Sequence, residues 1–366
     1  MKKLRWSLAI LALGIAYLLF WPIRVMPVPW QASPSPGYVG VHAPNTRLAA
    51  LQFIDLGDAE GPEHVAAGPD GNLYVAVAGG DILRMAPDGS RRGIYANTGG
   101  RVLGFDFDAD GRLIAADAIK GLVAVGTDRR VTVLVQQVAQ GDPIRYADAV
   151  IVAADGTVYF TDATTRFSPA DEGGTFMASV LDILEQSATG RVLAYTPSTG
   201  RTRVVAQGLS FANGIALSAD GRSLLVVETG RYRVWSIDVA AADLDVRRPD
   251  TKAHVLLDNL PGFPDNLMRG RDGRIWVGLA KPRNALADRL AGHPFVRRIV
   301  LRLPRFLWPI PEPYGHIVAF TDDGRIVDDL QDPSGAYPET TGATQLPGRL
   351  YVQSLHAKKL GWLPFD

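Results

Sequence analysis

A short hydrophobic pattern recurs along most of the chain. From about residue 51 onward, alternating segments rich in β-branched and aromatic residues follow tight glycine-containing turns, and each unit has a second apolar arm. The turn is usually Asp-Gly, a pair that supplies the positive φ angles that hairpins need. The turns are Asp70-Gly71, Asp110-Gly111, Asp155-Gly156, Asp220-Gly221, Asp272-Gly273 and a degenerate Pro347-Gly348.

This repeat predicts an all-β fold, a six-bladed β-propeller that occupies residues 51–366. Units with four strands at intervals of roughly 40–75 residues are typical of propeller blades. We expect residues 51–57 to pair with the C-terminal strands, which closes the ring and removes its exposed sheet edges. Residues 176–185 have helical spacing instead, and we expect this helix to cross one face of the propeller.

The N-terminal segment has a different character. Lys2, Lys3 and Arg5 precede an uncharged run from Trp6 to Ile23, which is long enough for a spanning helix. The pattern predicts a transmembrane anchor at residues 1–25 and a Pro-rich linker at residues 26–50. Positive charge before the span predicts a single-pass membrane protein with a cytoplasmic N-terminus and an extracytoplasmic propeller, periplasmic or luminal. A cleaved signal peptide is the alternative.

A second unusual segment covers residues 284–308. It contains Arg297, Arg298, Arg302 and Arg305 among apolar residues. Such a segment fits a basic amphipathic helix that rests on a bilayer. The alternative is an ordinary solvated lid between blades.

Composition narrows the chemistry. Lys and Arg number 38, as do Asp and Glu, so no net charge is available to attract nucleic acid. The absence of cysteine excludes disulfides, thiolate catalysis and Cys-ligated metals. Neither a Gly-Xaa-Ser-Xaa-Gly elbow nor a phosphate loop occurs, which disfavours serine-hydrolase and nucleotide chemistry. The six histidines are scattered, and of these His64 is a candidate channel residue.

Polar residues recur at one position relative to the turns. Glu63, Asp148, Asn213 and Asp265 each stand seven residues before the turn aspartate of their unit. In a propeller such positions converge at one mouth of the central channel. Oxygen side chains gathered there repel one another unless a hard cation such as Ca²⁺ neutralises them. The alternative is that Asn213 and Asp265 only cap tight turns.

Longer segments carry a family resemblance. They are residues 61–75, 146–167, 189–197, 208–230, 259–267 and 330–339. Through these segments the chain resembles the strictosidine synthase-like proteins, including the adipocyte plasma membrane-associated proteins, from about residue 55 to its C-terminus. The resemblance implies a six-bladed propeller, related more distantly to paraoxonases and gluconolactonases, which are Ca²⁺-dependent lactonases.

The same resemblance suggests individual ligands. Glu63, Asn213, Asp265 and Asn266 match calcium-binding positions of the paraoxonases, and Asp162 stands where those enzymes have a ligand asparagine. A gluconolactonase-like alignment makes Glu60 a rival for Glu63.

These features together predict a Ca²⁺-dependent hydrolase that acts on a small-molecule lactone or ester, with Asp148 or Asp162 as general base. Asp117 occupies the place of one histidine of the paraoxonase dyad. Residues 341–345 lack the glutamate of strictosidine synthase, and Glu339 is a displaced candidate, so true strictosidine synthase activity is not expected. The alternatives are a non-catalytic, membrane-anchored propeller with a structural metal and a partner-binding role, and a metal-independent lyase or synthase.

Overall fold

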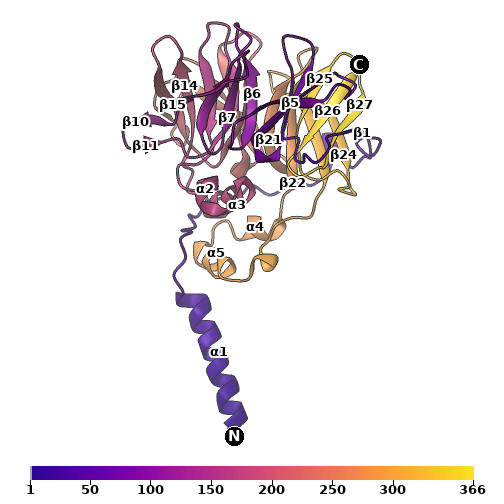
Figure 1. The fold of residues 1–366 in the computed structure, drawn as a ribbon. Coiled ribbons are helices and arrows are strands. Elements are labelled where there is room, and N and C mark those ends of the chain that lie inside the picture. Colours follow the sequence, from indigo (N-terminus) through magenta and orange to yellow (C-terminus); the bar gives the residue numbers. More distant parts are fainter. Residues whose placement is uncertain (1) are drawn as a thin grey trace.

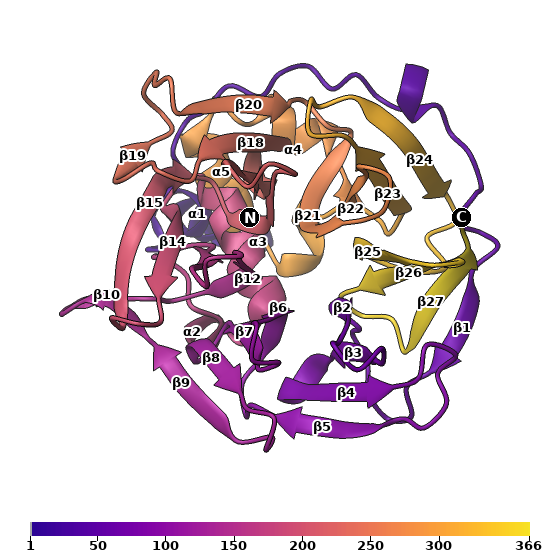
Figure 2. The same cartoon turned by 90° about the horizontal axis from the view of Figure 1, so that it is seen from above.

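The computed structural model describes residues 2–366, and β-sheets arranged around a central axis dominate it (Figures 1 and 2). Within these residues, six antiparallel sheets of at least four strands form the blades of a propeller, as the repeat predicted. A small hairpin of β10 (Gln137–Ala139) and β11 (Asp142–Pro143) accompanies the third blade.

The strands run outward from the axis in each of the first three blades. The first blade contains β2 (His64–Ala67), β3 (Leu73–Ala76), β4 (Asp81–Met85) and β5 (Gly93–Asn97); the second contains β6 (Val102–Phe107), β7 (Leu113–Asp117), β8 (Gly121–Val125) and β9 (Val131–Val135). The third contains β12 (Ala147–Val152), β13 (Val158–Asp162), β14 (Gly190–Thr196) and β15 (Arg201–Leu209), and the parallel strand β19 (Leu244–Asp245) extends it.

The remaining blades follow the same order. The fourth contains β16 (Ala212–Leu217), β17 (Ser223–Glu228), β18 (Arg233–Asp238) and β20 (Ala253–Leu257); the fifth contains β21 (Gly262–Arg269), β22 (Ile275–Pro282), β23 (Gly315–Phe320) and β24 (Ile326–Asp332). The sixth contains β25 (Thr340–Leu346), β26 (Arg349–Ser354), β27 (Lys359–Pro364) and β1 (Gln52–Asp55).

The last blade closes the ring. Strand β1 pairs antiparallel with β27, in register from Gln52 opposite Trp362 to Asp55 opposite Lys359. The prediction that residues 51–57 pair with the C-terminal strands is therefore confirmed. Because β1 and β27 share one sheet, the two ends of the propeller are joined in a single blade, which closes the ring.

The predicted Asp-Gly turns connect the innermost strand of a blade to its second strand. Their glycines have φ angles of +74°, +75°, +83°, +68° and +75°, a left-handed conformation that glycine adopts without strain. Apolar layers then pack neighbouring blades together. Between the fifth and sixth blades, for example, Trp276, Ile317 and Leu350 are fully buried.

Helices collect on one face of the propeller. α2 (Pro169–Glu172), α3 (Thr175–Glu185), α4 (Ala285–Arg289), α5 (Pro294–Leu301) and the 3₁₀ turn η4 (Arg305–Leu307) lie between the blades and α1 (Lys2–Phe20) (Figure 1). We call α2–α5 with η4 the helical cap. Helix α3 confirms the helix expected at residues 176–185.

Helix α1 projects away from the propeller (Figure 1). It is 19 residues long, with a mean hydropathy of 1.6 over its most apolar window, and its side chains are exposed. Among the described residues it is the helix with the length and composition to cross a membrane, a property shared by membrane anchors and signal sequences. The chain from residue 22 to 50 then runs along the cap and the outside of the fifth blade, with a 3₁₀ turn η1 (Gly40–His42).

Candidate metal centre

The polar residues singled out by their spacing lie at one level of the central channel. Each of Glu63, Asp148, Asn213 and Asp265 stands four residues before the end of its innermost strand, β2, β12, β16 or β21. The innermost strands of neighbouring blades contact one another around the axis. The second blade has Leu103 at the same level, in β6. The innermost strands therefore present oxygen donors from four blades at one channel mouth.

Backbone irregularities orient these side chains. The pairing of the innermost strand with the second strand shifts at Asp148 in the third blade, at Asn213 in the fourth, and at Asp265 and Asn266 in the fifth. Such bulges locally twist a strand and redirect its side chains. They occur where the innermost strands crowd together. A Cβ at Gly214 would lie 2.4 Å from the carbonyl oxygen of Asp265, so only glycine allows this approach.

Glu63 is the most heavily surrounded member of the cluster. Asn266 Nδ2 donates to the Glu63 carbonyl at 3.1 Å and to its Oε1 at 3.4 Å, and Thr341 Oγ1 donates to the same carbonyl at 3.3 Å. Arg101 Nη2 lies 3.5 Å from Glu63 Oε2. This arginine precedes β6 and compensates part of the negative charge. Sequence spacing could not reveal it, because it stands two residues from the ring position.

The carboxylates are close enough to affect each other's ionisation. Burial raises the pKa of Glu63 to about 7, although Arg101 opposes the shift. Burial raises the pKa of Asp148 well above its usual range, and Glu63 raises it further. Asp265 shows the same increase in pKa, from burial first and then from Glu63 and Asp148. The channel mouth therefore disfavours three neighbouring negative charges.

Two buried oxygens in this cluster accept no hydrogen bond within residues 2–366. They are Glu63 Oε2 and Asn213 Oδ1. An unpaired buried acceptor is costly. The donor set consists of carboxylate and amide oxygens, which are the ligands that Ca²⁺ prefers. The residues present therefore fit a hard divalent cation.

Asp162 is not part of this cluster. Its Oδ1 accepts from the backbone N–H groups of Arg145 and Tyr146 at 3.1 and 2.9 Å, and Arg191 Nε donates to Oδ2 at 2.9 Å. The expectation that Asp162 is a ligand or general base does not fit this arrangement, because Oδ1 already holds the start of β12 and Oδ2 is paired with Arg191 of β14. Asp117 holds the start of β6 in a similar way, accepting from the Arg101 N–H at 3.1 Å.

Glu60, the rival of Glu63, is exposed on the chain before β2, whereas Glu63 is buried. The geometry thus favours Glu63. His64 is also buried, and its ring packs on Phe105 with 4.6 Å between centroids. Burial lowers the pKa of His64 to about 4, which makes it a neutral core residue near physiological pH.

An apolar cavity of about 150 Å³ lies between the channel mouth and the helical cap. Asn213 and Asp265 line it on the propeller side. Aromatic and aliphatic side chains of α3, α4, α5 and the linker form most of its remaining wall, including Phe176, Leu290 and Trp30. The cavity thus places apolar surface directly above the oxygen cluster.

A polar group at the edge of this cavity contains Glu339, which the sequence offered only as a displaced candidate for the synthase glutamate. Its partners Lys281 and His356 were not predicted. Glu339 accepts a hydrogen bond from Lys281 Nζ at 2.9 Å and forms another with His356 Nδ1. Burial opposes ionisation of Glu339, but the hydrogen bonds from His356 and Lys281 lower its pKa overall. The three residues are far apart in the sequence and have no shared motif.

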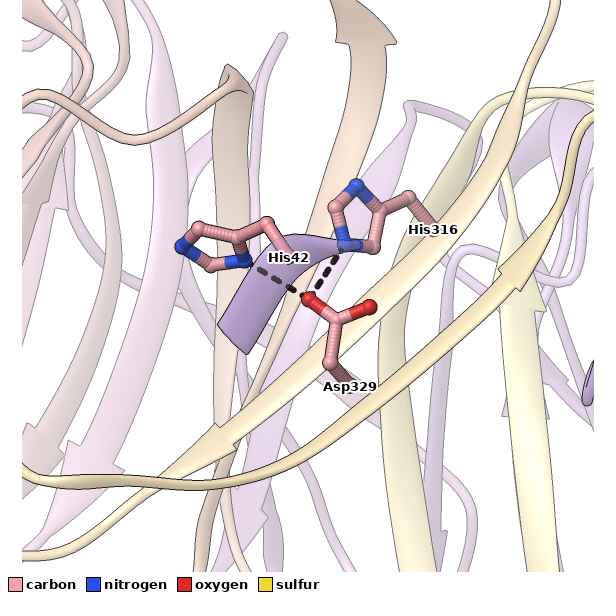
Figure 3. Close-up of side chains that lie close together, drawn as sticks. All are labelled: His42, His316 and Asp329. Carbon is pink, nitrogen blue, oxygen red and sulfur yellow. Dashed lines mark hydrogen bonds and ion pairs between the residues drawn. The ribbon is translucent and has the colours of Figure 1, made fainter. Parts of the chain in front are cut away.

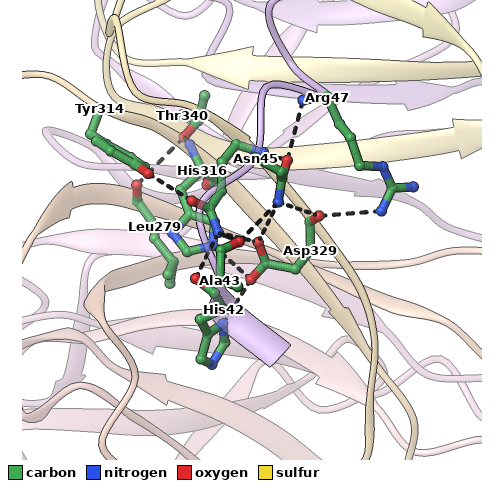
Figure 4. A network of polar contacts seen from close by, with 10 residues as sticks. His42, Ala43, Asn45, Arg47, Leu279, Tyr314, His316, Asp329 and Thr340 are labelled. Carbon is green, nitrogen blue, oxygen red and sulfur yellow. Dashed lines mark hydrogen bonds and ion pairs between the residues drawn. The ribbon is translucent and has the colours of Figure 1, made fainter. Parts of the chain in front are cut away.

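A second cluster of titratable residues lies on the fifth blade. His42 Nδ1 and His316 Nε2 approach the same oxygen of Asp329, at 2.7 and 2.9 Å (Figure 3). Gln331 and Asn45 donate to the other oxygen of Asp329, and the contacts extend to Arg47 (Figure 4). His42, Asn45 and Arg47 belong to the linker, whereas His316 belongs to β23 and Asp329 and Gln331 belong to β24. This network therefore attaches the linker to the outside of the propeller.

Fold and site together define a six-bladed β-propeller with an acidic channel mouth. Similar solved structures include a gluconolactonase from Xanthomonas campestris, with a TM-score of 0.59 and 19% identity over 94% of this chain and 99% of that one. The calcium-binding protein regucalcin from Agrobacterium tumefaciens has a TM-score of 0.56 and 14% identity over 86% of this chain and 93% of that one. At these identities the likeness concerns the fold.

Sequence comparison gives the family. The family model described as "Strictosidine synthase-like, N-terminal" matches residues 40–85, and the model "Strictosidine synthase" matches residues 148–237. Strictosidine synthase-like protein 10 of Arabidopsis thaliana is 30% identical over 85% of this chain and 87% of its own length. The adipocyte plasma membrane-associated protein of Danio rerio is 30% identical over 95% of this chain and 85% of its own length. The chain belongs to the strictosidine synthase-like family.

Proposed function

We propose that this protein is a Ca²⁺-dependent hydrolase of lactones or esters, anchored in a membrane by α1 with its propeller on the extracytoplasmic side. The observation that carries the proposal is the oxygen cluster beneath an apolar cavity, in which two buried oxygens accept no hydrogen bond from residues 2–366. The gluconolactonase and regucalcin folds are compatible with it, but a shared fold alone does not transfer an activity.

Glu63, Asn213 and Asp265 would hold the cation, and Asn266 positions Glu63 through its side-chain amide. When bound, Ca²⁺ supplies positive charge that neutralises the carboxylates and polarises a substrate carbonyl. The apolar walls of the cavity bind the hydrocarbon part of the substrate and restrict the access of water.

Asp148 is the proposed general base. Burial and the neighbouring Glu63 raise its pKa, which makes its carboxylate a stronger proton acceptor than an exposed aspartate. Water adds through its oxygen to the carbonyl carbon, and its proton passes to Asp148. The bond from that carbon to the ester oxygen then breaks, and the proton returns to the departing oxygen. The products are a carboxylic acid and an alcohol, or a hydroxy acid from a lactone.

The test uses the full chain in detergent or nanodiscs. Bound calcium is measured, and hydrolysis of an aryl ester and a lactone is compared with and without chelator. Asp148→Asn should lower kcat by about 100-fold while calcium binding persists. Asp155→Asn, on the exposed turn of the same hairpin, is the matched control and should leave the rate unchanged.

Calcium binding without hydrolysis of either substrate class would contradict the proposed activity. That result would favour the alternative, a non-catalytic propeller in which the metal has a structural role. Hydrolysis that survives chelator and Asp148→Asn would show that the chemistry occurs elsewhere.

A further inference from the structure

The helical cap exposes large apolar residues to solvent. Phe306 is 84% exposed and Phe295 is 58% exposed. Leu286, Val296 and Leu307 are also exposed in α4, α5 and η4. We call these five residues the outer cap face. Clustered exposed aromatic and aliphatic residues of this kind mark an interaction surface.

The end of α1 is attached to the cap itself. Arg302, which follows α5, donates from Nε to the Trp21 carbonyl at 2.7 Å and from Nη1 to the Leu18 carbonyl at 3.1 Å. These are carbonyls at the C-terminal end of α1, which have no partner within the helix. A cation is also favourable there because of the helix dipole. The cap therefore lies directly where α1 ends (Figure 1).

The chain that follows α1 is fixed to the cap by hydrogen bonds. The Met26 N–H donates to Glu185 Oε2 at 2.7 Å, and the Val28 N–H donates to the Glu185 carbonyl at 2.8 Å. Arg297 Nη1 donates to the Val28 carbonyl at 2.8 Å, and Val25 is buried in the cap. The linker is thus packed against α3 and α5, so the orientation of α1 relative to the cap is restricted.

We propose that the outer cap face is inserted into the surface of the bilayer that α1 spans, and that the site beneath the cap takes its substrate from the lipid. The charge of the segment agrees with this partner. Residues 294–308 contain four arginines and no acidic residue. Arg297 and Arg302 bind backbone carbonyls, whereas Arg305 is exposed beside Phe306, where it can contact anionic headgroups.

The inner side of the same helices forms the cavity wall. Ala287 of α4 and Val300 and Leu301 of α5 line the cavity, which Asn213 and Asp265 also line. Helices α4 and α5 therefore contribute both to the outer cap face and to the wall of the cavity. This inference about the substrate rests on the proposed hydrolysis. The substrate class is then an ester or lactone with a long acyl chain.

The first experiment measures the position of the outer cap face directly. The chain has no cysteine, so Phe306→Cys gives a single site for a spin label in the full chain. Ile94→Cys, an exposed apolar position in β5 of the first blade, is the control. The proteins are reconstituted in vesicles of phosphatidylcholine and phosphatidylglycerol. We expect high oxygen access and low access of a water-soluble nickel chelate at position 306, and the reverse at position 94.

A label at position 306 that is fully accessible to the nickel chelate would overturn membrane docking and identify the cap as a solvated lid. Spin–spin broadening at that position would indicate contact between two copies of the chain and would also overturn it. Omitting phosphatidylglycerol should make the label at position 306 shallower. An unchanged depth would remove the proposed role of Arg305.

The second experiment tests access of substrate from the lipid. Phe306→Asp should lower hydrolysis of a long-chain ester presented in vesicles by about tenfold, with little effect on a short soluble ester. Ile94→Asp is the control and should affect neither. Equal loss for both substrates would overturn entry from the lipid. If the unmodified protein hydrolyses neither ester, the proposed function and the entry route fail together, while the label depth still decides the docking.

Discussion

The two clusters of titratable side chains in this propeller have opposite effects on the ionisation of their carboxylates. At the channel mouth, three carboxylates lie together, and burial raises their pKa values. On the fifth blade, Asp329 is also buried, but hydrogen bonds from His316 and His42 outweigh burial and lower its pKa. Burial alone therefore does not decide the ionisation of a carboxylate. The supply of donors around it does.

The difference separates a structural network from a candidate cation site. Both oxygens of Asp329 accept hydrogen bonds, and the network connects the linker to β24 (Figure 4). At the channel mouth, Glu63 Oε2 and Asn213 Oδ1 accept none among residues 2–366. A cation would relieve that deficit, whereas Asp329 has no comparable deficit.

The largest effect is expected from removing the satisfied carboxylate. Asp329→Ala leaves the donors of His42, His316, Gln331 and Asn45 without their acceptor. We expect a loss of about 3 kcal/mol of stability, measured as a lower thermal midpoint, with or without calcium. Asp58→Ala, at an exposed position, is the control and should change the midpoint little. An unchanged midpoint in Asp329→Ala would show that the network does not stabilise the propeller.

At the channel mouth, removing a carboxylate charge should stabilise the protein in chelator, whereas removing Asp329 destabilises it. Asp265→Asn relieves repulsion with Glu63 and Asp148, so it should raise the thermal midpoint in chelator. It should also abolish stabilisation by calcium, which for the native chain reaches about 2.7 kcal/mol at a hundredfold excess over Kd. Asp272→Asn, on the exposed turn of the same hairpin, should retain the calcium response. A calcium response that survives in Asp265→Asn would place the cation elsewhere.

The repeating parts of this fold could be read from the sequence, because their cause is local. An Asp-Gly turn requires positive φ at one glycine, and the strand that follows it alternates apolar and polar residues. These two local patterns were sufficient to predict six hairpin units and the segment that closes the ring. The level of Glu63, Asp148, Asn213 and Asp265 followed from the same period. Their orientation did not, since it depends on bulges formed where neighbouring blades crowd together.

Interactions between distant residues were beyond such reasoning. Asp162 resembled a ligand, yet its partner Arg191 lies in the next strand and commits the carboxylate to a structural role. His42 reaches Asp329 across 287 residues, from a linker without a regular pattern. The ligand-like residues of a family can therefore be aligned from sequence, while their availability depends on side chains that the alignment does not include.

The two clusters should also differ in their pH dependence. In chelator, Glu63 has a folded pKa of about 7 against an ordinary value of 4.5, so its contribution is present below pH 4.5 and is lost as the pH rises to 7. Burial lowers the pKa of His316 below 6.5, so its contribution is present above pH 6.5 and is lost as the pH falls. Each slope is at most about 1.4 kcal/mol per pH unit. Thermal midpoints should be measured across this range in chelator for both proteins. We expect Glu63→Gln to reduce the loss of stability at rising pH, and the same slope in both proteins would contradict the assignment.

The smallest effect is expected from a change that keeps the hydrogen bond but alters its chemistry. His42, His316 and Asp329 have ligand atoms close enough together to hold a transition metal, so the network needs a direct test. His42→Asn places an amide N–H near the position of Nδ1, which can still donate to Asp329. If the cluster is a hydrogen-bond network, the thermal midpoint of the variant should correspond to a loss of stability below about 1 kcal/mol. Added Zn²⁺ should then change the midpoints of the variant and the native chain equally.

A zinc-dependent rise in the native midpoint that disappears in His42→Asn would make this cluster a metal site and remove the contrast with the channel mouth. Zinc could also bind at the channel mouth. The comparison of His42 with His42→Asn is therefore repeated in a protein that also carries Asp265→Asn, where only zinc bound at His42 would still raise the thermal midpoint.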